Sequence, residues 1–435
     1  MIPHHPKYQP KITFMSWKTR LVTVAIITLA ILAELAPSPK INPINLANPN
    51  HSKAAAMTPP NNHIDVDARL VAANTKFGFN LFNTLTKQQP NQNIFISPTS
   101  VVLALSMAYN GVRGETKQEM TKVLELTGMT TQEINAANQA LQNSFQKVDP
   151  NIQVLVANSL WAQQGFSLKP EFLQTNQKYY NANLTELNFM NPQAISIIND
   201  WVSQKTQGKI DKILDKISPD GVLFLINAIY FKGNWKTPFD KSQTANKTFS
   251  LTDGSSKQHP MMSQKGIYGY YETDTFQAVS LPYGKKGDLA MYIFLPNSNS
   301  NLATFLQQLT PENWNEWMPE FTNINGTIEI PRFKIEYEVE LQNTLTALGM
   351  AGIFDRSKAD FSPMTDNNVA VDSVKHKTFV EVSEEGTEAA AVTSIPGTRG
   401  SRLPFQMNVN RPFFCAIQDN TTGTILFMGT IVDPQ

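Results

Sequence analysis

The chain has 435 residues, which is long enough for several domains of ordinary size or for one large domain. Its 36 basic and 36 acidic residues give a net charge of zero, so the composition indicates neither a polyanion nor a membrane surface as a partner. A single cysteine, Cys415, excludes an internal disulfide and a cysteine-based zinc site. Cys415 lies in an apolar run, which predicts a buried small side chain, and the histidines are too scattered to bind a metal ion. We therefore expect no metal and no cofactor.

The N-terminal region has the pattern of an export signal. Lys18 and Arg20 precede an apolar run over residues 21–36, so residues 1–36 are expected to be a signal peptide of a secreted or periplasmic protein. An uncleaved membrane anchor is the alternative, although a run of sixteen residues, broken by Thr23, Thr28 and Glu34, is short for a membrane span. Residues 37–64 are rich in Pro, Asn and Ala, which predicts a disordered spacer. The folded domain is then expected over residues 65–435.

The first predicted elements of this domain are a capped helix and a short strand. Asp67 can cap a helix whose apolar face carries Leu70, Phe77, Leu81 and Leu85. Ser97 is expected to end a strand over residues 94–96, and Pro98 suits the first position of the following helix.

The middle of the chain alternates helix and strand patterns. We predict helices over residues 131–148 and 195–205, the second stopping near Gly208, with a long apolar strand over 152–161 between them. The strongest buried-strand pattern is 222–231, and its one anomaly is Asn227, because a buried amide needs hydrogen-bond partners. Alternatively, Asn227 faces solvent at a strand end.

Further strands are predicted toward the C-terminus, and they lead into an unusual segment. The strands cover residues 277–282, 289–295, 328–333 and 369–382, with a helix around Leu341, Leu345 and Met350. From Thr387 to Ile395 every residue is small, β-branched or glutamate, and alternate positions form one uncharged face suited to a packed strand. Residues 396–402 are rich in turn formers and contain two arginines, which is typical of a loop tip open to proteases.

Signatures of catalysis and of nucleic-acid binding are missing from the sequence. It has no Gly-x-Ser-x-Gly elbow, no His-Glu-x-x-His helix, no phosphate-binding glycine loop and no dinucleotide fingerprint. Basic residues are neither in excess nor interleaved with aromatic residues, as a nucleic-acid surface would require. We therefore expect a protein that is not an enzyme and that does not bind nucleic acid.

Two motifs resemble those of a known family. Residues 384–391, Glu-Glu-Gly-Thr-Glu-Ala-Ala-Ala, resemble the hinge of inhibitory serpins, and residues 410–414, Asn-Arg-Pro-Phe-Phe, resemble the strand that closes their reactive loop. The resemblance covers about residues 66–434. It implies an α+β serpin fold with three β-sheets, about eight to nine helices and an exposed reactive-centre loop, in a monomeric protein.

The resemblance also implies roles for particular residues. The hinge would comprise Glu384, Glu385, Gly386, Thr387, Glu388, Ala389, Ala390 and Ala391. The region where the central sheet opens would contain Ser97, Ser100, Asn227, Trp235, Arg332 and His376. His376 is expected to bond Asn227 across the sheet, and Arg332 to pair with Glu384 as an exposed ion pair contributing at most about 1 kcal/mol. For Ser97 and Ser100, plain helix capping is the alternative, and Trp235 would otherwise be assigned to the core.

The function implied by the resemblance is inhibition of a serine protease by a suicide-substrate mechanism. The preferred reactive bond is Arg399–Gly400, which suits a trypsin-like target. The family's usual loop length instead gives Gly400–Ser401, which would suit an elastase-like or subtilisin-like protease, and Arg402–Leu403 is a third alternative. Activation by heparin is not expected, since Lys147 is the only basic residue of the helix over 131–148. The competing interpretation is a non-inhibitory carrier or chaperone of the same fold.

Overall fold

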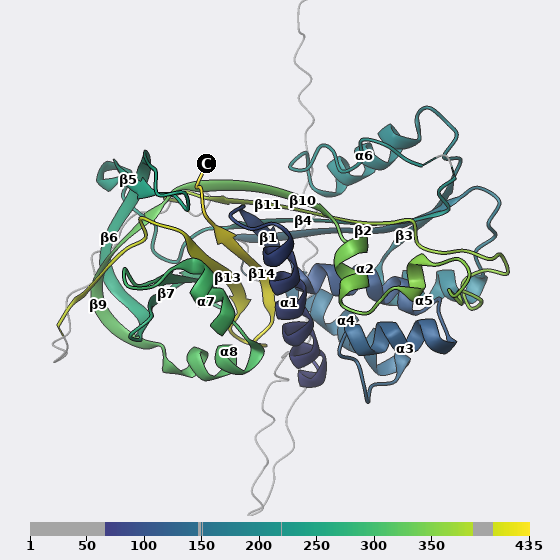
Figure 1. The fold of residues 1–435 in the computed structure, drawn as a ribbon, viewed down its shortest axis with the longest axis horizontal. Coiled ribbons are helices and arrows are strands. Elements are labelled where there is room, and N and C mark those ends of the chain that lie inside the picture. The colour runs from purple at the N-terminus through teal and green to yellow at the C-terminus, as the bar shows by residue number, and fades with distance from the viewer. Residues whose placement is uncertain (1–65, 147–148, 150, 219, 386–402) are drawn as a thin grey trace, which may run out of the picture. The chain divides into compact units, whose positions relative to one another are not determined.

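The structure of the protein is a computed structural model, shown as a ribbon in Figure 1, and it describes residues 66–146, 149, 151–218, 220–385 and 403–435. Within this part of the chain the α-helices are α1 (Ala68–Gln88), α2 (Pro98–Tyr109), α3 (Gly114–Val123), α4 (Thr131–Gln146), α5 (Pro170–Tyr180), α6 (Ala194–Lys205), α7 (Leu302–Gln308), α8 (Pro311–Trp317) and α9 (Gln342–Ala347). Three short 3₁₀ helices lie at Lys241–Gln243, Met318–Glu320 and Gly352–Phe354.

The strands are β1 (Ile94–Ile96), β2 (Ile152–Gln163), β3 (Asn183–Leu187), β4 (Leu223–Gly233), β5 (Ala245–Ser250), β6 (Ser256–Glu272), β7 (Phe276–Tyr283), β8 (Leu289–Pro296), β9 (Thr322–Pro331), β10 (Phe333–Glu340), β11 (Ser373–Val382), β12 (Phe405–Asn408), β13 (Phe413–Asp419) and β14 (Ile425–Ile431). Helices and strands occur in mixed order along the chain, so the predicted α+β class is confirmed, as is the expected number of helices.

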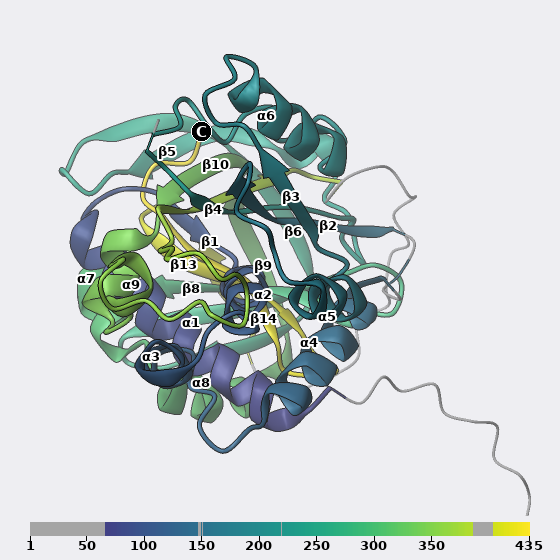
Figure 2. The same ribbon diagram turned by 90° about the vertical axis from the view of Figure 1, so that its right-hand side faces the viewer.

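A five-stranded sheet lies at the centre of the domain. Its strand order is β10-β11-β4-β2-β3, and β4 is buried along almost its whole length. Burial on both faces explains why the sequence of β4 is a nearly continuous apolar run. Figures 1 and 2 show α6 on one face of this sheet and α2 and α5 on the other. The predicted buried strand over 222–231 is thereby confirmed.

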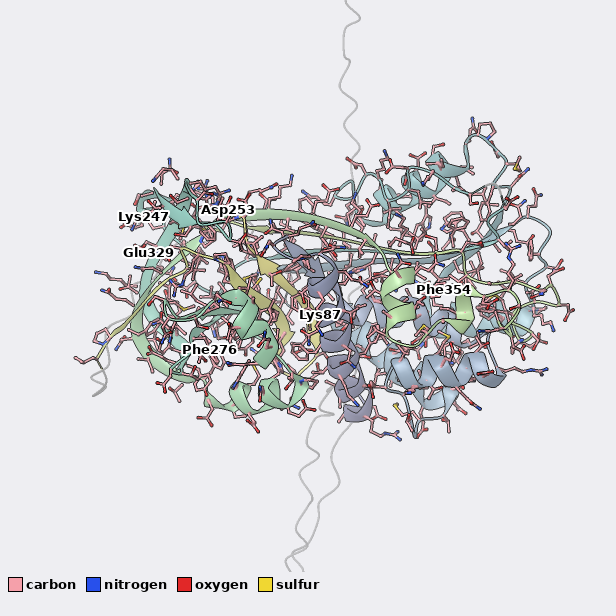
Figure 3. The ribbon with its side chains drawn as sticks, in the orientation of Figure 1. Lys87, Lys247, Asp253, Phe276, Glu329 and Phe354 are labelled. Carbon is pink, nitrogen blue, oxygen red and sulfur yellow. The ribbon has the colours of Figure 1, made fainter. Side chains whose placement is uncertain are left out.

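The remaining strands form one continuous hydrogen-bonded ladder in the described part of the chain. Its order is β1-β14-β13-β8-β7-β6-β9-β12, with β5 also paired to β6. The family resemblance implied three sheets, whereas the described residues form two. The physical reason is the length of β6, whose 17 residues pair in turn with β5, β9 and β7 and so join the two halves of the ladder. Lys247 of β5 and Glu329 of β9 form an ion pair across β6 (Figure 3).

The large hydrophobic core between these layers includes the residues that the sequence placed there. Leu70, Phe77, Leu81 and Leu85 of α1 are fully buried. Asp67 caps α1 by accepting a hydrogen bond from the backbone N–H of Arg69 at 2.9 Å. Cys415 of β13 is buried as predicted, and burial raises the pKa of its thiol.

Three predicted strand boundaries are wrong. The strand expected over 328–333 is divided at Arg332 into the end of β9 and the start of β10. The strand expected from residue 369 begins at Ser373, because Val371 donates its N–H to Ile353 O at 2.8 Å, outside the sheet. The motif at 410–414 is strand only from Phe413. Before that point Asn410 donates its N–H back to Asn408 O at 2.9 Å, and Pro412 has no N–H to donate.

The expectations for the N-terminal 65 residues, both the signal or anchor over 1–36 and the spacer over 37–64, fall on residues outside the described structure. None of the helices in the described part of the chain has the length and apolar character needed to cross a membrane.

Candidate functional site at the parallel strand pair

The central sheet contains a parallel pair, β11 and β4, flanked by antiparallel partners. β11 and β4 align from Ser373 opposite Phe224 to Val380 opposite Phe231. β10 is antiparallel to β11, and β2 is antiparallel to β4. A segment that followed β11 and turned back between β11 and β4 would run antiparallel to both. One parallel ladder would then be replaced by two antiparallel ladders, which are slightly more stable per residue.

A buried polar network crosses the middle of this pair, and we call it the sheet-centre network: His376, Asn227, Asn158, Ser97 and Ser100. His376 of β11 lies opposite Asn227 of β4, which lies opposite Asn158 of β2. The backbone N–H of Ser97 donates to His376 Nε2 at 3.1 Å. The neutral ring therefore has its proton on Nδ1 and donates it to Asn227 Oδ1 at 2.5 Å.

The same network joins the sheet to the start of α2. Asn227 Nδ2 donates to the backbone oxygen of Ser100 at 3.2 Å and to Asn158 Oδ1 at 2.5 Å. It also donates to Ser100 Oγ. Ser97 also caps α2, since its Oγ accepts from the Ser100 N–H at 3.3 Å. Helix capping and contact with the sheet are thus both present at Ser97. The solvent-facing alternative for Asn227 is excluded, because its exposed fraction is 1%.

Burial controls the charge of this network. His376 is completely buried, and loss of solvation lowers its pKa to about 3. Among the described residues none with a negative charge is bonded to the ring, so nothing offsets that loss. The ring is therefore neutral at physiological pH, as its two hydrogen bonds require.

A second cluster lies where β11 ends, and we call it the sheet-end cluster: Trp235, Glu384, Arg332, Thr244 and Glu385. Trp235 Nε1 donates to Ser383 O at 2.8 Å, and its backbone N–H donates to Glu385 O at 3.3 Å. The indole also stacks on Tyr283, with ring centroids 4.3 Å apart. Trp235 is thus buried, as a core residue would be, and it also contacts the chain that leaves β11.

The Arg332–Glu384 pair forms as predicted, but its predicted exposure is wrong. Arg332 Nε donates to the two carboxylate oxygens of Glu384 at 2.8 and 2.9 Å, and Arg332 Nη2 also contacts that carboxylate. The Glu384 side chain is only 2% exposed, while that of Arg332 is 43% exposed. Residues between β4 and β5 bond both the backbone and the side chain of Glu384. Phe239 donates its N–H to Glu384 O at 2.8 Å, and Thr244 Oγ1 donates to Glu384 Oε1 at 2.5 Å.

Burial and hydrogen bonding oppose each other at this carboxylate. Burial raises the pKa of Glu384, but the bonds from Arg332 and Thr244 outweigh it, so the pKa lies below its ordinary value. Glu384 is therefore ionised in the folded protein. Next to it, Glu385 forms an ion pair with Lys241, whose side chain is more exposed.

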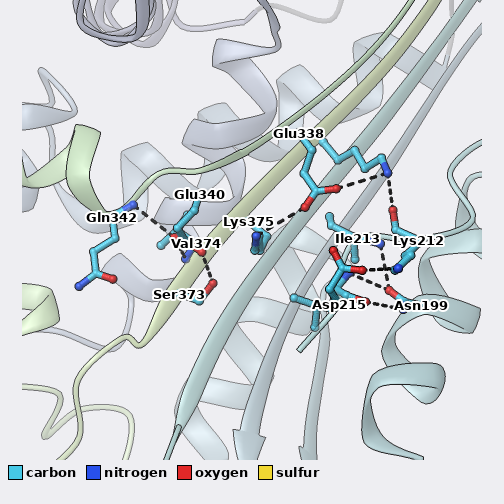
Figure 4. Close-up of polar contacts among 12 residues, drawn as sticks. Asn199, Lys212, Ile213, Asp215, Glu338, Glu340, Gln342, Ser373, Val374 and Lys375 are labelled. Atoms are coloured by element: carbon cyan, nitrogen blue, oxygen red, sulfur yellow. Dashed lines mark hydrogen bonds and ion pairs between the residues drawn. The ribbon is translucent and has the colours of Figure 1, made fainter. Parts of the chain in front are cut away.

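A third set of contacts holds the segment after α6 over β11. Lys377 of β11 has a side chain only 8% exposed, and its Nζ donates to Lys212 O at 2.5 Å. The same Nζ forms ion pairs with Glu336 at 2.7 Å and Glu338 at 3.4 Å, both on β10. Figure 4 shows Lys212 and Glu338 at this contact. We call this set of contacts the Lys377 tether.

Sequence reasoning missed several of these residues. Asn158 and Ser159 interrupt the apolar residues 154–157 and 160–162 of β2, which was the signal that could have identified Asn158. Thr244 and Lys377 carry no such signal, because threonine and lysine are common on exposed surfaces and their partners are distant in sequence.

Most of the expected loop lies outside the described residues. These are the hinge positions Gly386, Thr387, Glu388, Ala389, Ala390 and Ala391, and the bait positions Arg399, Gly400, Ser401 and Arg402. The described chain ends at Glu385 in the sheet-end cluster and resumes at Leu403, whose side chain is 91% exposed.

Comparisons with known proteins agree with this architecture. The model of the serpin (serine protease inhibitor) family matches residues 72–434. The leukocyte elastase inhibitor of Homo sapiens is 37% identical over 382 residues, which cover 84% of this chain and 100% of that protein. The native thermophilic serpin tengpin superimposes with a TM-score of 0.78 and 31% identity, covering 85% of this chain and 95% of tengpin.

A second solved structure is human thyroxine-binding globulin in complex with its ligand. It superimposes with a TM-score of 0.78 and 26% identity, covering 85% of this chain and 99% of that protein. The family model spans the whole described domain apart from its first residues, and relatives above 30% identity match over nearly their full length. The chain belongs to the serpin family.

Proposed function

We propose that this protein inhibits a serine protease as a monomeric suicide substrate. The protease serine attacks the carbonyl carbon of Arg399, the Arg399–Gly400 peptide bond breaks, and Gly400 leaves as a free amine. Arg399 is then held as an ester on the protease. The chain from Glu385 to Thr398 enters the central sheet between β11 and β4, carries the protease with it and distorts the protease active site before the ester is hydrolysed.

The observation that supports this mechanism best is the parallel β11–β4 pair, with the chain leaving β11 beside it. A strand inserted there completes an antiparallel ladder on each side. About a dozen new backbone hydrogen bonds at roughly 1 kcal/mol each would favour the inserted state. The small side chains of the hinge suit this, because a strand between two packed strands has little room for bulk.

Insertion requires contacts of the present sheet to break. The sheet-centre network bridges the strands that must separate, through the bond between His376 and Asn227. The sheet-end cluster holds the entry point through Trp235 and Glu384. The Lys377 tether holds the covering segment down on β11. We propose that these three groups of contacts keep the sheet closed until the reactive loop is cut.

The class of target protease depends on which residue of the loop supplies the carbonyl carbon that the protease attacks. A buried acidic pocket discriminates strongly for a guanidinium, which favours Arg399 and a trypsin-like protease. The name of the human relative, leukocyte elastase inhibitor, favours Gly400 and an elastase-like or subtilisin-like protease instead. Cleavage at Arg402–Leu403 would only consume the inhibitor.

The second candidate function is that of a non-inhibitory carrier. It is favoured by the likeness to thyroxine-binding globulin, which is a carrier by name. The hinge argues against it, because bulky, charged or proline residues would be expected where this chain has Ala389, Ala390 and Ala391.

We also propose that residues 1–36 direct export and that residues 37–64 are a spacer before the inhibitor domain. This is supported by the family match, which begins only at residue 72, and by the human relative, whose full length is matched by 84% of this chain. N-terminal sequencing of protein exported from an expressing cell would test it. A mature N-terminus within or just after residues 31–36 is expected, and an intact Met1 on a membrane-bound protein would contradict it.

The experiment that tests the proposed function mixes the full chain separately with trypsin, an elastase and subtilisin. Denaturing gels and intact-mass measurements follow each reaction. We expect a covalent complex at the combined mass with trypsin, together with a released peptide that begins at Gly400. If every protease only cuts the loop and stays active, the carrier interpretation replaces inhibition.

A hinge substitution tests insertion itself. We expect Ala391→Glu to convert the inhibitor into a substrate, because its side chain would have to enter the packed face of the new strand. The matched control is Ala390→Glu on the opposite face, which should retain most inhibition. The measurement is the number of inhibitor molecules consumed per protease molecule inactivated. Equal behaviour of the two variants would contradict the insertion model.

A further inference from the structure

A pocket of about 460 Å³ lies away from the sheet-opening contacts described above. It is formed by the end of α1 with the residues that follow it, by α7, and by Arg411 and Pro412 between β12 and β13. None of the residues in the sheet-centre network or the sheet-end cluster lines it. Its volume falls in the range of pockets that hold one small organic molecule.

The pocket combines an apolar wall with a single ionised group. Ile94, Leu302, Leu306 and Val432 contribute apolar side chains, and most of the other lining residues are neutral and polar. Arg411 is the one charged residue among the lining residues. A ligand that matches this lining has an apolar body and one anionic group.

Arg411 is held in place without being neutralised. Its Nε and Nη2 donate to Pro296 O at 3.0 and 2.7 Å, and its Nη1 donates to Asn410 Oδ1 at 3.1 Å. A guanidinium has five N–H groups. Three are used in these bonds, which leaves one N–H on each terminal nitrogen for a further acceptor. The two terminal nitrogens of a guanidinium can together donate to a carboxylate in a bidentate contact.

The acidic residues near the pocket do not neutralise Arg411. Asp433 is paired with Lys257, and Asp253 accepts hydrogen bonds from Ser255. Lys87, in the last turn of α1, adds a second positive charge near the pocket rather than a negative one; Figure 3 labels Lys87 and Asp253. In the described part of the chain no carboxylate forms an ion pair with Arg411, and half-burial lowers the pKa of its guanidinium. A half-buried guanidinium without a counterion favours an anionic ligand.

We propose that this pocket binds a small amphipathic carboxylate. The carboxylate accepts the two remaining N–H groups of Arg411, and the apolar body packs against Leu302 and Leu306 of α7. The proposal is independent of protease inhibition, because it rests on residues that the proposed inhibitory mechanism does not use.

The test compares two probes on the full chain, 4-phenylbutanoate and 4-phenylbutan-1-ol, which share the phenyl ring and carbon chain and differ in the head group, an ionised carboxylate against a neutral hydroxyl. Isothermal titration and ligand-observed NMR at neutral pH measure binding of each. We expect saturable binding of one equivalent of the acid and weaker binding of the alcohol. Arg411→Gln should weaken binding of the acid by about 10- to 100-fold, because a charge-assisted pair of bonds is lost. The affinity for the alcohol should stay nearly unchanged. Arg356→Gln, which also removes an arginine bonded to a backbone carbonyl, is the matched control.

A second variant keeps the test decisive if Arg411→Gln does not fold. Leu306→Trp should fill the pocket and abolish binding of both probes, whereas Thr304→Trp on the exposed side of α7 should not. The proposal is overturned if the acid and the alcohol bind equally well. It is also overturned if the acid fails to saturate at millimolar concentration, or if Leu306→Trp leaves its affinity unchanged.

Discussion

Glu384 shows how one residue joins the strand to the loop that follows it. Its carboxylate is almost fully buried, yet it remains ionised because Arg332 and Thr244 donate to it. Removing one partner of a buried pair costs more than removing a partner of an exposed pair, because the remaining charge stays unsolvated. The stability of the sheet end should therefore depend on Arg332 more than the sequence alone suggests.

We predict that Arg332→Ala lowers the free energy of unfolding by about 1–3 kcal/mol, a value reduced for the partial exposure of Arg332. In a Glu384→Gln background the same substitution should cost less than half as much. Arg356→Ala is the control, since its pair with Asp372 is long, at 3.6 Å, and half-exposed. Urea unfolding followed by circular dichroism measures the change in the free energy of unfolding for Arg332→Ala in each background and for Arg356→Ala. Equal costs in the two backgrounds would show that the pair is not coupled.

The pH dependence of Glu384 follows from the direction of its pKa shift. The folded pKa lies below the ordinary value of 4.5, so the stabilisation is complete above about pH 4.5 and is lost as the pH falls through the folded pKa. His376 affects stability at higher pH than Glu384 does. Its folded pKa of about 3 lies below its ordinary value of 6.5, so protonation in the unfolded chain removes stability as soon as the pH falls below 6.5.

We therefore predict that wild-type protein loses roughly 2 kcal/mol more stability than His376→Gln between pH 6.5 and about pH 5. The glutamine cannot take up a proton, so its contribution is independent of pH. Urea unfolding at several pH values measures the slope. His259 is present in both proteins, and its own titration cancels in the comparison. Parallel pH profiles of the two proteins would contradict the assignment.

At the scale of elements, the Lys377 tether adds polar contacts between β11 and the segment after α6, whose Ile210, Ile213 and Leu214 are buried in the same hydrophobic cluster as Phe379 of β11. Lys377 reaches from the sheet to the carbonyl of Lys212, and Glu336 and Glu338 balance its charge. Any strand that enters between β11 and β4 must pass beneath this segment. The tether therefore sets how easily one face of the sheet is uncovered.

We predict that Lys377→Met speeds hydrogen exchange of the backbone amides over residues 209–217 by about tenfold, because the substitution keeps the apolar stem and removes only the tether. Lys375→Met is the matched control, since Lys375 contacts Glu338 but does not bond Lys212. Mass spectrometry of peptides after deuterium labelling measures the rates, with peptides of α1 as an internal reference. Unchanged exchange over 209–217 would mean that the apolar packing of the segment and its bonds to Asn199 of α6 hold it without the tether.

At the scale of the whole molecule, the parallel strand pair predicts that the intact chain is not in its most stable form. We expect cutting of the reactive loop to raise stability by on the order of 10 kcal/mol, because the inserted strand gains a ladder on each side. Thermal unfolding before and after limited cleavage of the full chain measures this rise. Cleaved Ala391→Glu should show a much smaller rise. An unchanged unfolding temperature in the cleaved wild type would contradict insertion.

The sequence predicted the features that depend on local pattern or on the family resemblance. The class of fold, the buried strand β4 and the bond between His376 and Asn227 were all expected. Membership of the serpin family also confirms the expectation that the chain belongs to a family of inhibitors and not of enzymes. The burial of Glu384 was missed, because two adjacent glutamates look exposed and the residues that bond Glu384, Phe239 and Thr244, are distant in sequence. The continuous ladder through β6 was missed for the same reason, since long-range pairing leaves no local signal.

The burial of Cys415 has a practical consequence for following the proposed movement. The native thiol is enclosed in β13 and its pKa is raised by burial, so it should not react with thiol-directed dyes. A cysteine introduced at an exposed position such as Leu403 would then be the single reactive thiol of the folded protein. One dye at that position would report fluorescence changes there without first replacing the native cysteine.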